Sequence, residues 1–153
     1  MIHIKKYVLL ILTVMWISMI FYMSSKPGDE SARTSLKIVD VIVEKLSLTE
    51  TQIDKVHYAV RKTAHFTEYF ILSFLVASTY SKFYNKKLNV SLVLLICILV
   101  ATGDEFLQSF IEGRGSQVKD VLIDFSGSLT QVLIFSVVSA NTNKRFRRNK
   151  YIG

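Results

Sequence analysis

Four polar side chains share one face of a predicted helix and offer acid–base chemistry. His65, Glu68 and Tyr69 follow the i, i+3, i+4 spacing that places side chains on one side of an α-helix, and Lys62 lies one turn earlier. An imidazole beside a carboxylate can act as a base or bind a metal ion. These residues open a very apolar stretch, and inside a membrane an ionised side chain costs about 2.5–3.5 kcal/mol at mid-helix. Something must offset that cost.

Two further apolar stretches each carry acidic residues near one end. Asp104 and Gln108 lie one helical turn apart with Glu105 alongside, and Asp120 and Asp124 have the same i, i+4 spacing. Ionised and exposed to lipid, these carboxylates and that of Glu68 would cost on the order of 15 kcal/mol. We therefore predict one polar cluster, made of the acids Glu68, Asp104, Glu105, Asp120 and Asp124 and the bases Lys62, His65 and Arg114.

This predicted cluster suits either catalysis or binding. In an enzyme we expect His65 to be the base or a metal ligand, Glu68 to orient it, and Asp104 and Glu105 to be acids or ligands. Arg114 lies between two glycines, where it can fold over the cluster, hold a phosphate or carboxylate, or simply be solvated. The other candidates for ligand binding are Lys62, Tyr69, Gln108, Asp120 and Asp124.

A divalent cation is an open option for the same residues. Oxygen ligands without thiols favour Mg²⁺, Mn²⁺ or Ca²⁺, and His65 near Glu68 leaves Zn²⁺ open. No ligand set is spaced tightly enough in the sequence to assign a metal. The single Cys97 excludes an internal disulfide, and we expect it to be a buried apolar residue.

The composition is typical of a membrane protein. Half of the 153 residues are hydrophobic, with one proline and six glycines, and the apolar runs are too long for an ordinary soluble domain of this size. The net charge of +7 does not indicate nucleic-acid binding, because the basic residues are spread along the chain. Their densest cluster, residues 144–150, directly follows an apolar stretch and is interpreted as a membrane-facing anchor.

Four apolar stretches predict an all-α fold, a single domain over residues 1–153 built as a bundle of four transmembrane helices. Each stretch is near the ~20 residues that cross a bilayer. The first resembles a signal peptide, but its apolar run exceeds the usual length of about 7–15 residues and no convincing cleavage site follows, so we expect an uncleaved anchor. The predicted spans are residues 7–23, 64–81, 88–108 and 119–140.

Charge distribution predicts that both termini are cytoplasmic. The N-terminal arm, the loop SKFYNKK and the tail at residues 141–153 are basic and hold no acid, whereas all twelve acids lie in the other loops or at the outer helix ends. The long outer loop, residues 24–62, has helical periodicity in two segments. Thr49 and Gln52 match a capping box, so a helix is expected to start near Glu50 and continue into the second span. A helix on the membrane surface, a lid and a solvated linker all fit this loop.

Three sequence blocks resemble the VanZ-like family of small membrane proteins: RKTAHFTEYFIL, DEFLQSFIEGR and DVLIDFSG, with SSKPG as a weaker fourth. The resemblance covers roughly residues 61–128. Asp124 stands where many members have Asn, and Gln131 replaces a frequent glycine, which leaves the local charge and helix packing open. By position, the family's polar residues fall on Lys62, His65, Glu68, Tyr69, Asp104, Glu105, Gln108, Arg114 and Asp120.

The resemblance implies a multi-pass protein of the bacterial cytoplasmic membrane, in a family named for low-level resistance to the glycopeptide antibiotic teicoplanin. Its expected partners are the lipid bilayer and a lipid-linked or cell-wall precursor, and not nucleic acid. Three classes of function stay open. In the first, the cluster binds or modifies such a component, and in its catalytic version the chain is a hydrolase or transferase. In the second, the cluster only binds a ligand or locks the bundle together. In the third, the chain is a small proton-coupled or ion transporter.

Overall fold

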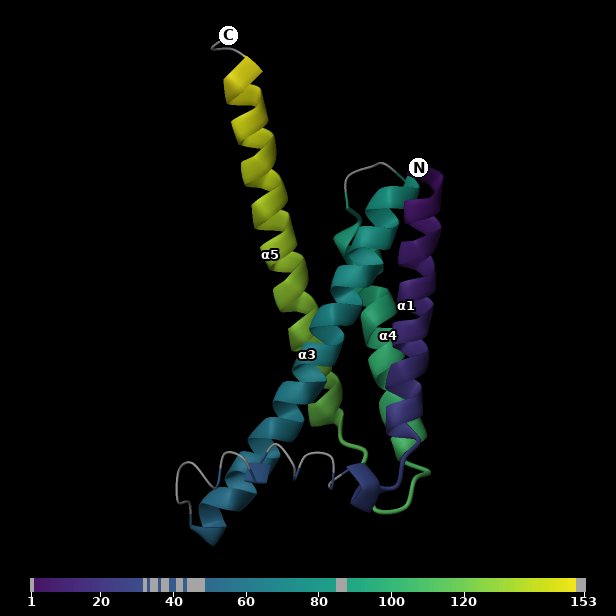
Figure 1. Ribbon diagram of the computed structural model, residues 1–153, viewed down its shortest axis with the longest axis vertical. Coiled ribbons are helices and arrows are strands. Elements are labelled where there is room, and N and C mark those ends of the chain that lie inside the picture. Colours follow the sequence, from purple (N-terminus) through teal and green to yellow (C-terminus); the bar gives the residue numbers. More distant parts are fainter. Residues whose placement is uncertain are drawn as a thin grey trace.

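The computed structural model describes residues 2–31, 33, 36, 39, 40, 43, 49–84 and 88–150, and these residues form long helices joined by loops (Figure 1). The helices are α1 (Ile2–Ser24), α3 (Glu50–Tyr84), α4 (Val90–Gln108) and α5 (Val118–Lys150). The described residues contain no β-strand, so the predicted all-α class is confirmed.

Local sequence signals explain where two of the helices begin. The Thr49 backbone N–H donates to Gln52 Oε1 over 2.9 Å, which confirms the predicted capping interaction at the start of α3. From there α3 runs without a break through residues 64–81. At the start of α4, the side chain of Asn89 accepts a hydrogen bond of 3.1 Å from the Leu92 N–H. The other periodic segment of the predicted outer loop, residues 35–46, lies mostly outside the described residues.

In the described part of the chain, three helices are long and apolar enough to cross a membrane: Ile4–Ser24, Val90–Gln108 and Val118–Ser139. Large apolar side chains such as Met15, Leu99 and Val137 are exposed on them, as expected of surfaces that face lipid. The predicted second span, residues 64–81 of α3, does not reach that apolarity because it includes His65, Glu68 and several hydroxyl side chains. The fourth crossing therefore remains a prediction.

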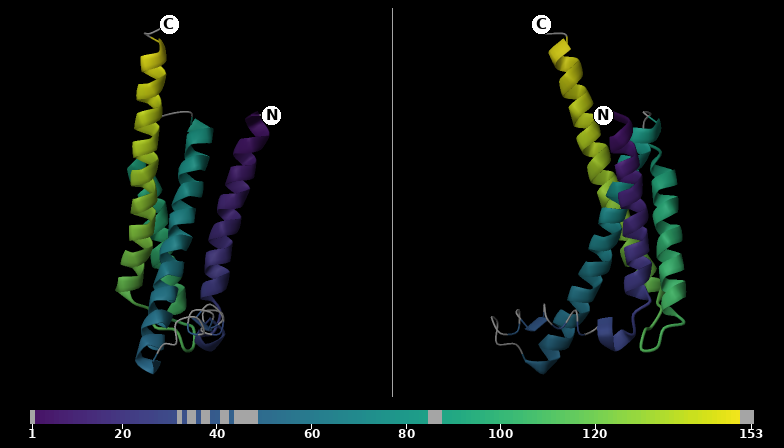
Figure 2. Two further views of the ribbon diagram at one scale, coloured as in Figure 1. Left: turned by 60° about the vertical axis from the view of Figure 1, so that its left-hand side comes forward. Right: turned by 45° about the vertical axis from the view of Figure 1, so that its right-hand side comes forward.

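The helices pack so that α3 contacts all the others, most extensively α5. The N-terminal end of α1 and the C-terminal end of α5 lie at one end of the bundle, and the loop of residues 109–117 lies at the opposite end (Figures 1 and 2). Cys97 is fully buried, as predicted. The core consists of Ile20, Tyr69, Leu72, Val76, Ala77, Val93, Cys97, Ala101 and Val132.

Two glycines allow the backbone to approach closely around the loop end. A Cβ atom at Gly127 would lie 2.2 Å from the carbonyl oxygen of Phe66, so α5 and α3 meet there backbone to backbone. A Cβ atom at Gly28 would lie 2.0 Å from the Gly113 carbonyl oxygen, and the Gly28 N–H donates to Glu112 O over 3.1 Å. Gly28 thus lets the segment after α1 contact the 109–117 loop, and Gly127 lets α5 contact α3.

Candidate functional site

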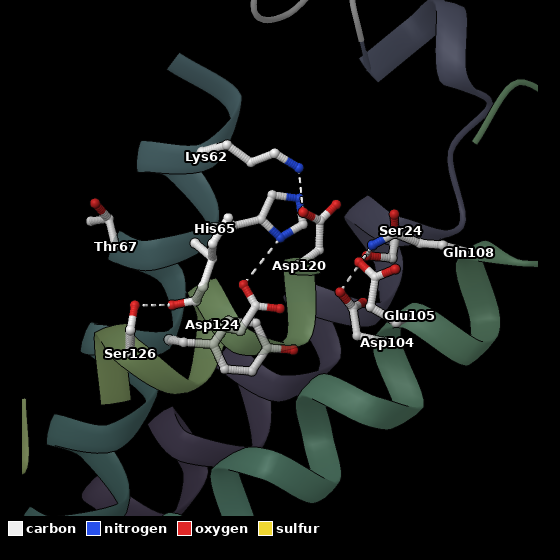
Figure 3. Close-up of polar contacts among 12 residues, drawn as sticks. Ser24, Lys62, His65, Thr67, Asp104, Glu105, Gln108, Asp120, Asp124 and Ser126 are labelled. Carbon is white, nitrogen blue, oxygen red and sulfur yellow. Dashed lines mark hydrogen bonds and ion pairs between the residues drawn. The ribbon is translucent and has the colours of Figure 1, made fainter. Parts of the chain in front are cut away.

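Three helices bring the predicted acids together near the loop end of the bundle. His65 comes from α3, Asp104 and Glu105 from the last turns of α4, and Asp120 and Asp124 from the first turns of α5 (Figure 3). Their exposed fractions are 7%, 1%, 3%, 1% and 0%, in that order. Residues far apart in the sequence thus form one buried polar cluster, as the cost of exposing carboxylates to lipid predicts.

Two ion pairs connect α3 with α5. Lys62 Nζ pairs with Asp120 Oδ1, and His65 Nδ1 lies 3.2 Å from Asp124 Oδ1. The carboxylate in contact with His65 is therefore that of Asp124, whereas Glu68, which we expected to orient the imidazole, is half-buried and lines an adjacent cavity. Orientation of His65 by Glu68 stays a prediction, and Asp124 is the better-placed candidate.

Gln108 holds the end of α4 in place. Its Nε2 donates to Asp104 Oδ2 over 3.0 Å and to Ser24 Oγ over 3.2 Å. One turn away, Glu105 Oε2 accepts a hydrogen bond of 2.9 Å from the Gln117 backbone N–H. Each of the two acids thus has one carboxylate oxygen fixed by a hydrogen bond.

Arg114 folds back over the end of α1. Its Nη2 donates to Met23 O over 2.8 Å and its Nε to Lys26 O over 3.2 Å, while Nη1 lies 3.5 Å from Gln108 Oε1. Burial lowers the pKa of Arg114 from its ordinary value. Of the roles left open for this arginine by the sequence, these contacts favour the one in which the side chain folds back, since the guanidinium fastens the loop to α1.

A cavity of about 130 Å³ lies beside the cluster. Basic residues line it from three segments: Lys26 after α1 (its ammonium pairs with Glu30), Arg61 on α3 and Arg114 in the 109–117 loop. The sequence did not single out Arg61, although its i, i+4 spacing to His65 was a usable signal. Within the described part of the chain, Arg61 Nε is buried and has no hydrogen-bond partner. The lining residues are Met23, Ser24, Lys26, Ser31, Arg61, Ala64, His65, Glu68 and Arg114.

Further polar side chains continue from the cluster into the bundle. Tyr69 is fully buried, and among the described residues its hydroxyl has no hydrogen-bond partner. Deeper along the same helices, Ser73 Oγ donates to Gln131 Oε1 over 2.9 Å, and Ser128 Oγ lies 3.2 Å from Tyr69 O. Gln131, which stands where the family resemblance leads us to expect glycine, is thus accommodated by a hydrogen bond between α3 and α5.

Four side chains of the cluster can hold a metal ion. His65, Asp104, Glu105 and Asp124 each offer a ligand atom, and these atoms all lie within 4.8 Å of one another. The sequence could not show this, since the ligands come from three helices. The predicted site residues therefore fall into three groups. The buried cluster holds His65, Asp104, Glu105, Gln108, Asp120 and Asp124, with the half-buried Lys62 paired to it; His65, Glu68 and Arg114 line the cavity; and Tyr69 is buried deeper.

An apolar exterior around helices of membrane-spanning length, with a buried polar cluster at one end, defines a multi-pass membrane protein. The chain belongs to the VanZ/LLP1 family, whose model matches residues 9–139, most of the sequence. This confirms the resemblance seen in the three sequence blocks. No curated protein and no solved structure shows significant similarity to the chain.

Proposed function

We propose that this VanZ-family protein acts at the outer face of the bacterial cytoplasmic membrane, on or with a cell-envelope component that carries an anionic group. The observation that carries the proposal is the cavity beside the acidic cluster, with Lys26, Arg61 and Arg114 on its wall. Guanidinium groups recognise phosphate and carboxylate groups through their planar fork. The fork of Arg114 is partly used on backbone carbonyls, so Arg61 is the main anion-binding candidate.

The size of the cavity bears on the kind of ligand. About 130 Å³ is well below the roughly 300–1,000 Å³ of pockets that enclose drug-sized ligands. It suits a phosphate-sized headgroup, with a lipid tail left in the bilayer, better than an entire glycopeptide antibiotic. Lower susceptibility to teicoplanin would then be indirect, through the envelope component on which the antibiotic acts.

The membrane topology in this proposal has four crossings with both termini cytoplasmic. Basic residues without acids flank the end of the bundle where α1 begins, and the C-terminal end of α5 lies toward this same end, which supports this orientation (Figure 1). The stretch at residues 64–81 of α3 then makes the fourth crossing. In that orientation the cluster and its cavity face outward.

A second candidate is a membrane-embedded hydrolase or transferase that acts on a lipid-linked envelope precursor. The close grouping of one imidazole with three carboxylates favours it, because these groups can move a proton or position a reacting water. His65 would act as base or ligand, and Asp104 and Glu105 as acids or ligands. The transporter alternative has less support. On the cytoplasmic side of Glu68 in α3, Asp104 in α4 and Asp124 in α5, these helices carry no further Asp, Glu or His that could continue a proton path.

Binding of a polyprenyl phosphate to the purified full-length protein in nanodiscs tests the proposal. We expect the phosphate lipid to bind and the neutral polyprenol to bind at least 10-fold more weakly, with Arg61→Gln weakening phosphate-lipid binding by a similar factor. Lys55→Gln, an exposed lysine on the same helix, is the matched control. Equal binding of the two lipids, or an Arg61→Gln variant that binds as well as the control, would contradict the anionic-group proposal.

The link to antibiotics needs a cellular measurement. Expression of the chain in a teicoplanin-susceptible Gram-positive host is expected to raise the inhibitory concentration of teicoplanin, and Arg61→Gln is expected to remove the increase at equal protein level. Turnover of the polyprenyl phosphate or a glycosylated derivative in the nanodisc experiment would favour the enzymatic candidate over binding alone.

A further inference from the structure

Three buried carboxylates in the cluster are not matched by a lysine or arginine. Asp120 has Lys62 as its partner, but among the described residues no Lys or Arg forms an ion pair with Asp104, Glu105 or Asp124. These three side chains are 1%, 3% and 0% exposed. Of the bases that the structure describes, the one in contact with them is His65, beside Asp124, and a single imidazolium would offset only one of three buried charges. Uncompensated charge at such sites is strongly unfavourable, so the carboxylates must be protonated or share a cation.

The oxygen atoms of these carboxylates indicate which alternative applies. Considering only the described residues, Asp104 Oδ1, Glu105 Oε1 and both oxygens of Asp124 are buried without a hydrogen-bond partner, as is His65 Nδ1. A protonated carboxyl group would still need an acceptor for its proton. Instead, the second oxygens of Asp104 and Glu105 are held by Gln108 and by the Gln117 backbone, while the first oxygens are left bare.

This pattern is typical of metal ligands. Ligating side chains are usually oriented by hydrogen bonds to their non-ligating atoms, and the ligating atoms have no other partner. Opposite ligands of one ion lie about 4.0–4.8 Å apart, twice a bond of 2.0–2.4 Å. The ligand atoms of His65, Asp104, Glu105 and Asp124 all fall within 4.8 Å of one another.

We propose that His65, Asp104, Glu105 and Asp124 bind one divalent cation between α3, α4 and α5. One imidazole among carboxylates, with no thiolate, favours Mn²⁺ or Zn²⁺ over Mg²⁺ and Ca²⁺, which prefer oxygen ligands alone. The ion offsets most of the charge of the three acids. It would also lie beside the cavity that His65 lines, next to the wall that carries Arg61 and Arg114.

The test uses the full-length protein in detergent, stripped with a chelator and titrated with MnCl₂ alone. Free Mn²⁺ gives a strong electron paramagnetic resonance signal that is lost on binding, so the titration counts sites. We expect one Mn²⁺ per chain, displaced by Zn²⁺, and a ¹⁴N modulation in the pulsed spectrum from the imidazole of His65. A wild-type protein that binds neither ion, or that binds Mn²⁺ without a nitrogen ligand, would overturn the proposal without recourse to any variant.

Variants locate the site further. Asp124→Asn and Glu105→Gln are expected to weaken Mn²⁺ binding by at least 10-fold, and Gln108→Ala, which removes the support of Asp104, by about 10–100-fold. Glu112→Gln, an exposed acid on the adjacent loop, is the matched control and should bind normally. Affinity unchanged in both Asp124→Asn and Glu105→Gln would contradict the ligand set. Because arginines can bind an anionic lipid in metal-free protein, this proposal and the proposed function fail separately.

Discussion

The Nδ1 atom of His65 lies 3.2 Å from Oδ1 of Asp124, and this contact joins α3 to α5 at the centre of the buried cluster. Around it, α4 contributes Asp104 and Glu105, so three helices share one polar interior. The arrangement follows from the solvent: hydrocarbon offers these groups no hydrogen bonds, and each must find partners inside the protein.

The Lys62–Asp120 ion pair is expected to be needed for stability. Lys62→Met leaves the Asp120 carboxylate buried and unpaired, which should lower the free energy of unfolding by about 3–5 kcal/mol. The double variant Lys62→Met with Asp120→Leu should recover most of that loss. Unfolding by an SDS titration measures both, with Lys55→Met as the exposed control on the same helix. A single variant as stable as wild type would show that the pair is not a buried one in the membrane.

Gly127 is expected to tolerate no side chain. In Gly127→Ala the new Cβ would meet the Phe66 carbonyl oxygen at 2.2 Å, so α5 must move away from α3, at a cost of about 1–3 kcal/mol. Gly115→Ala is the control, because its Cβ would have only Gln117 Nε2 nearby, at 4.0 Å. Thermal unfolding in detergent should give a clearly lower Tm for Gly127→Ala alone; equal values for both variants would contradict the close helix contact.

The helices and the gathering of acids were predictable from the sequence because both follow from local spacing and solvent cost. Apolar length gave the helices, Thr49 and Gln52 marked the start of α3, and the i, i+4 acids indicated a common face. Pairing between helices was not predictable. Glu68 was expected to orient His65 because it is near in sequence, yet the contact is made by Asp124 from α5, whose register on α3 depends on the close approach at Gly127.

At the loop end of the bundle, too, contacts between distant segments were not predictable from the sequence. The short SSKPG block appeared only as a weak family element, yet Ser24 accepts a hydrogen bond from Gln108 and Gly28 contacts Gly113. These contacts join segments far apart in the chain, so the spacing of residues in the sequence does not predict them. The role of Arg114 was left open for the same reason, since its acceptors are backbone carbonyls, which every residue has.

Arg114 is expected to fasten the 109–117 loop to α1. Arg114→Lys keeps the charge but cannot reach the carbonyls of Met23 and Lys26 together with Gln108, so it should behave like Arg114→Ala. We expect faster amide hydrogen exchange in residues 109–117 and a stability loss of about 1–3 kcal/mol in both variants. Lys119→Gln, an exposed neighbour, should leave exchange unchanged. Full rescue by lysine would indicate that only the charge matters.

The proposed topology predicts opposite accessibility for two exposed positions. In a Cys97→Ala background, Glu112→Cys should react with a membrane-impermeant maleimide in intact cells, whereas Tyr84→Cys should react only after the membrane is permeabilised. Labelling is read on a gel, and loss of the buried Cys97 removes background reaction. The reverse pattern would place the cluster on the cytoplasmic side, and equal labelling of both positions in intact cells would contradict the four crossings.

The central claim, that α3, α4 and α5 pool their polar residues in one buried cluster, is tested most directly by cross-linking in native membranes. In the Cys97→Ala background, the pair His65→Cys and Asp124→Cys is treated with a short bifunctional bromobimane, which fluoresces when both thiols react. Thr67→Cys with Asp124→Cys is the control, because Thr67 is exposed and points away from the cluster (Figure 3). Strong fluorescence from the first pair alone is the predicted result. Absence of cross-linking in that pair, or equal fluorescence from both pairs, would contradict the account.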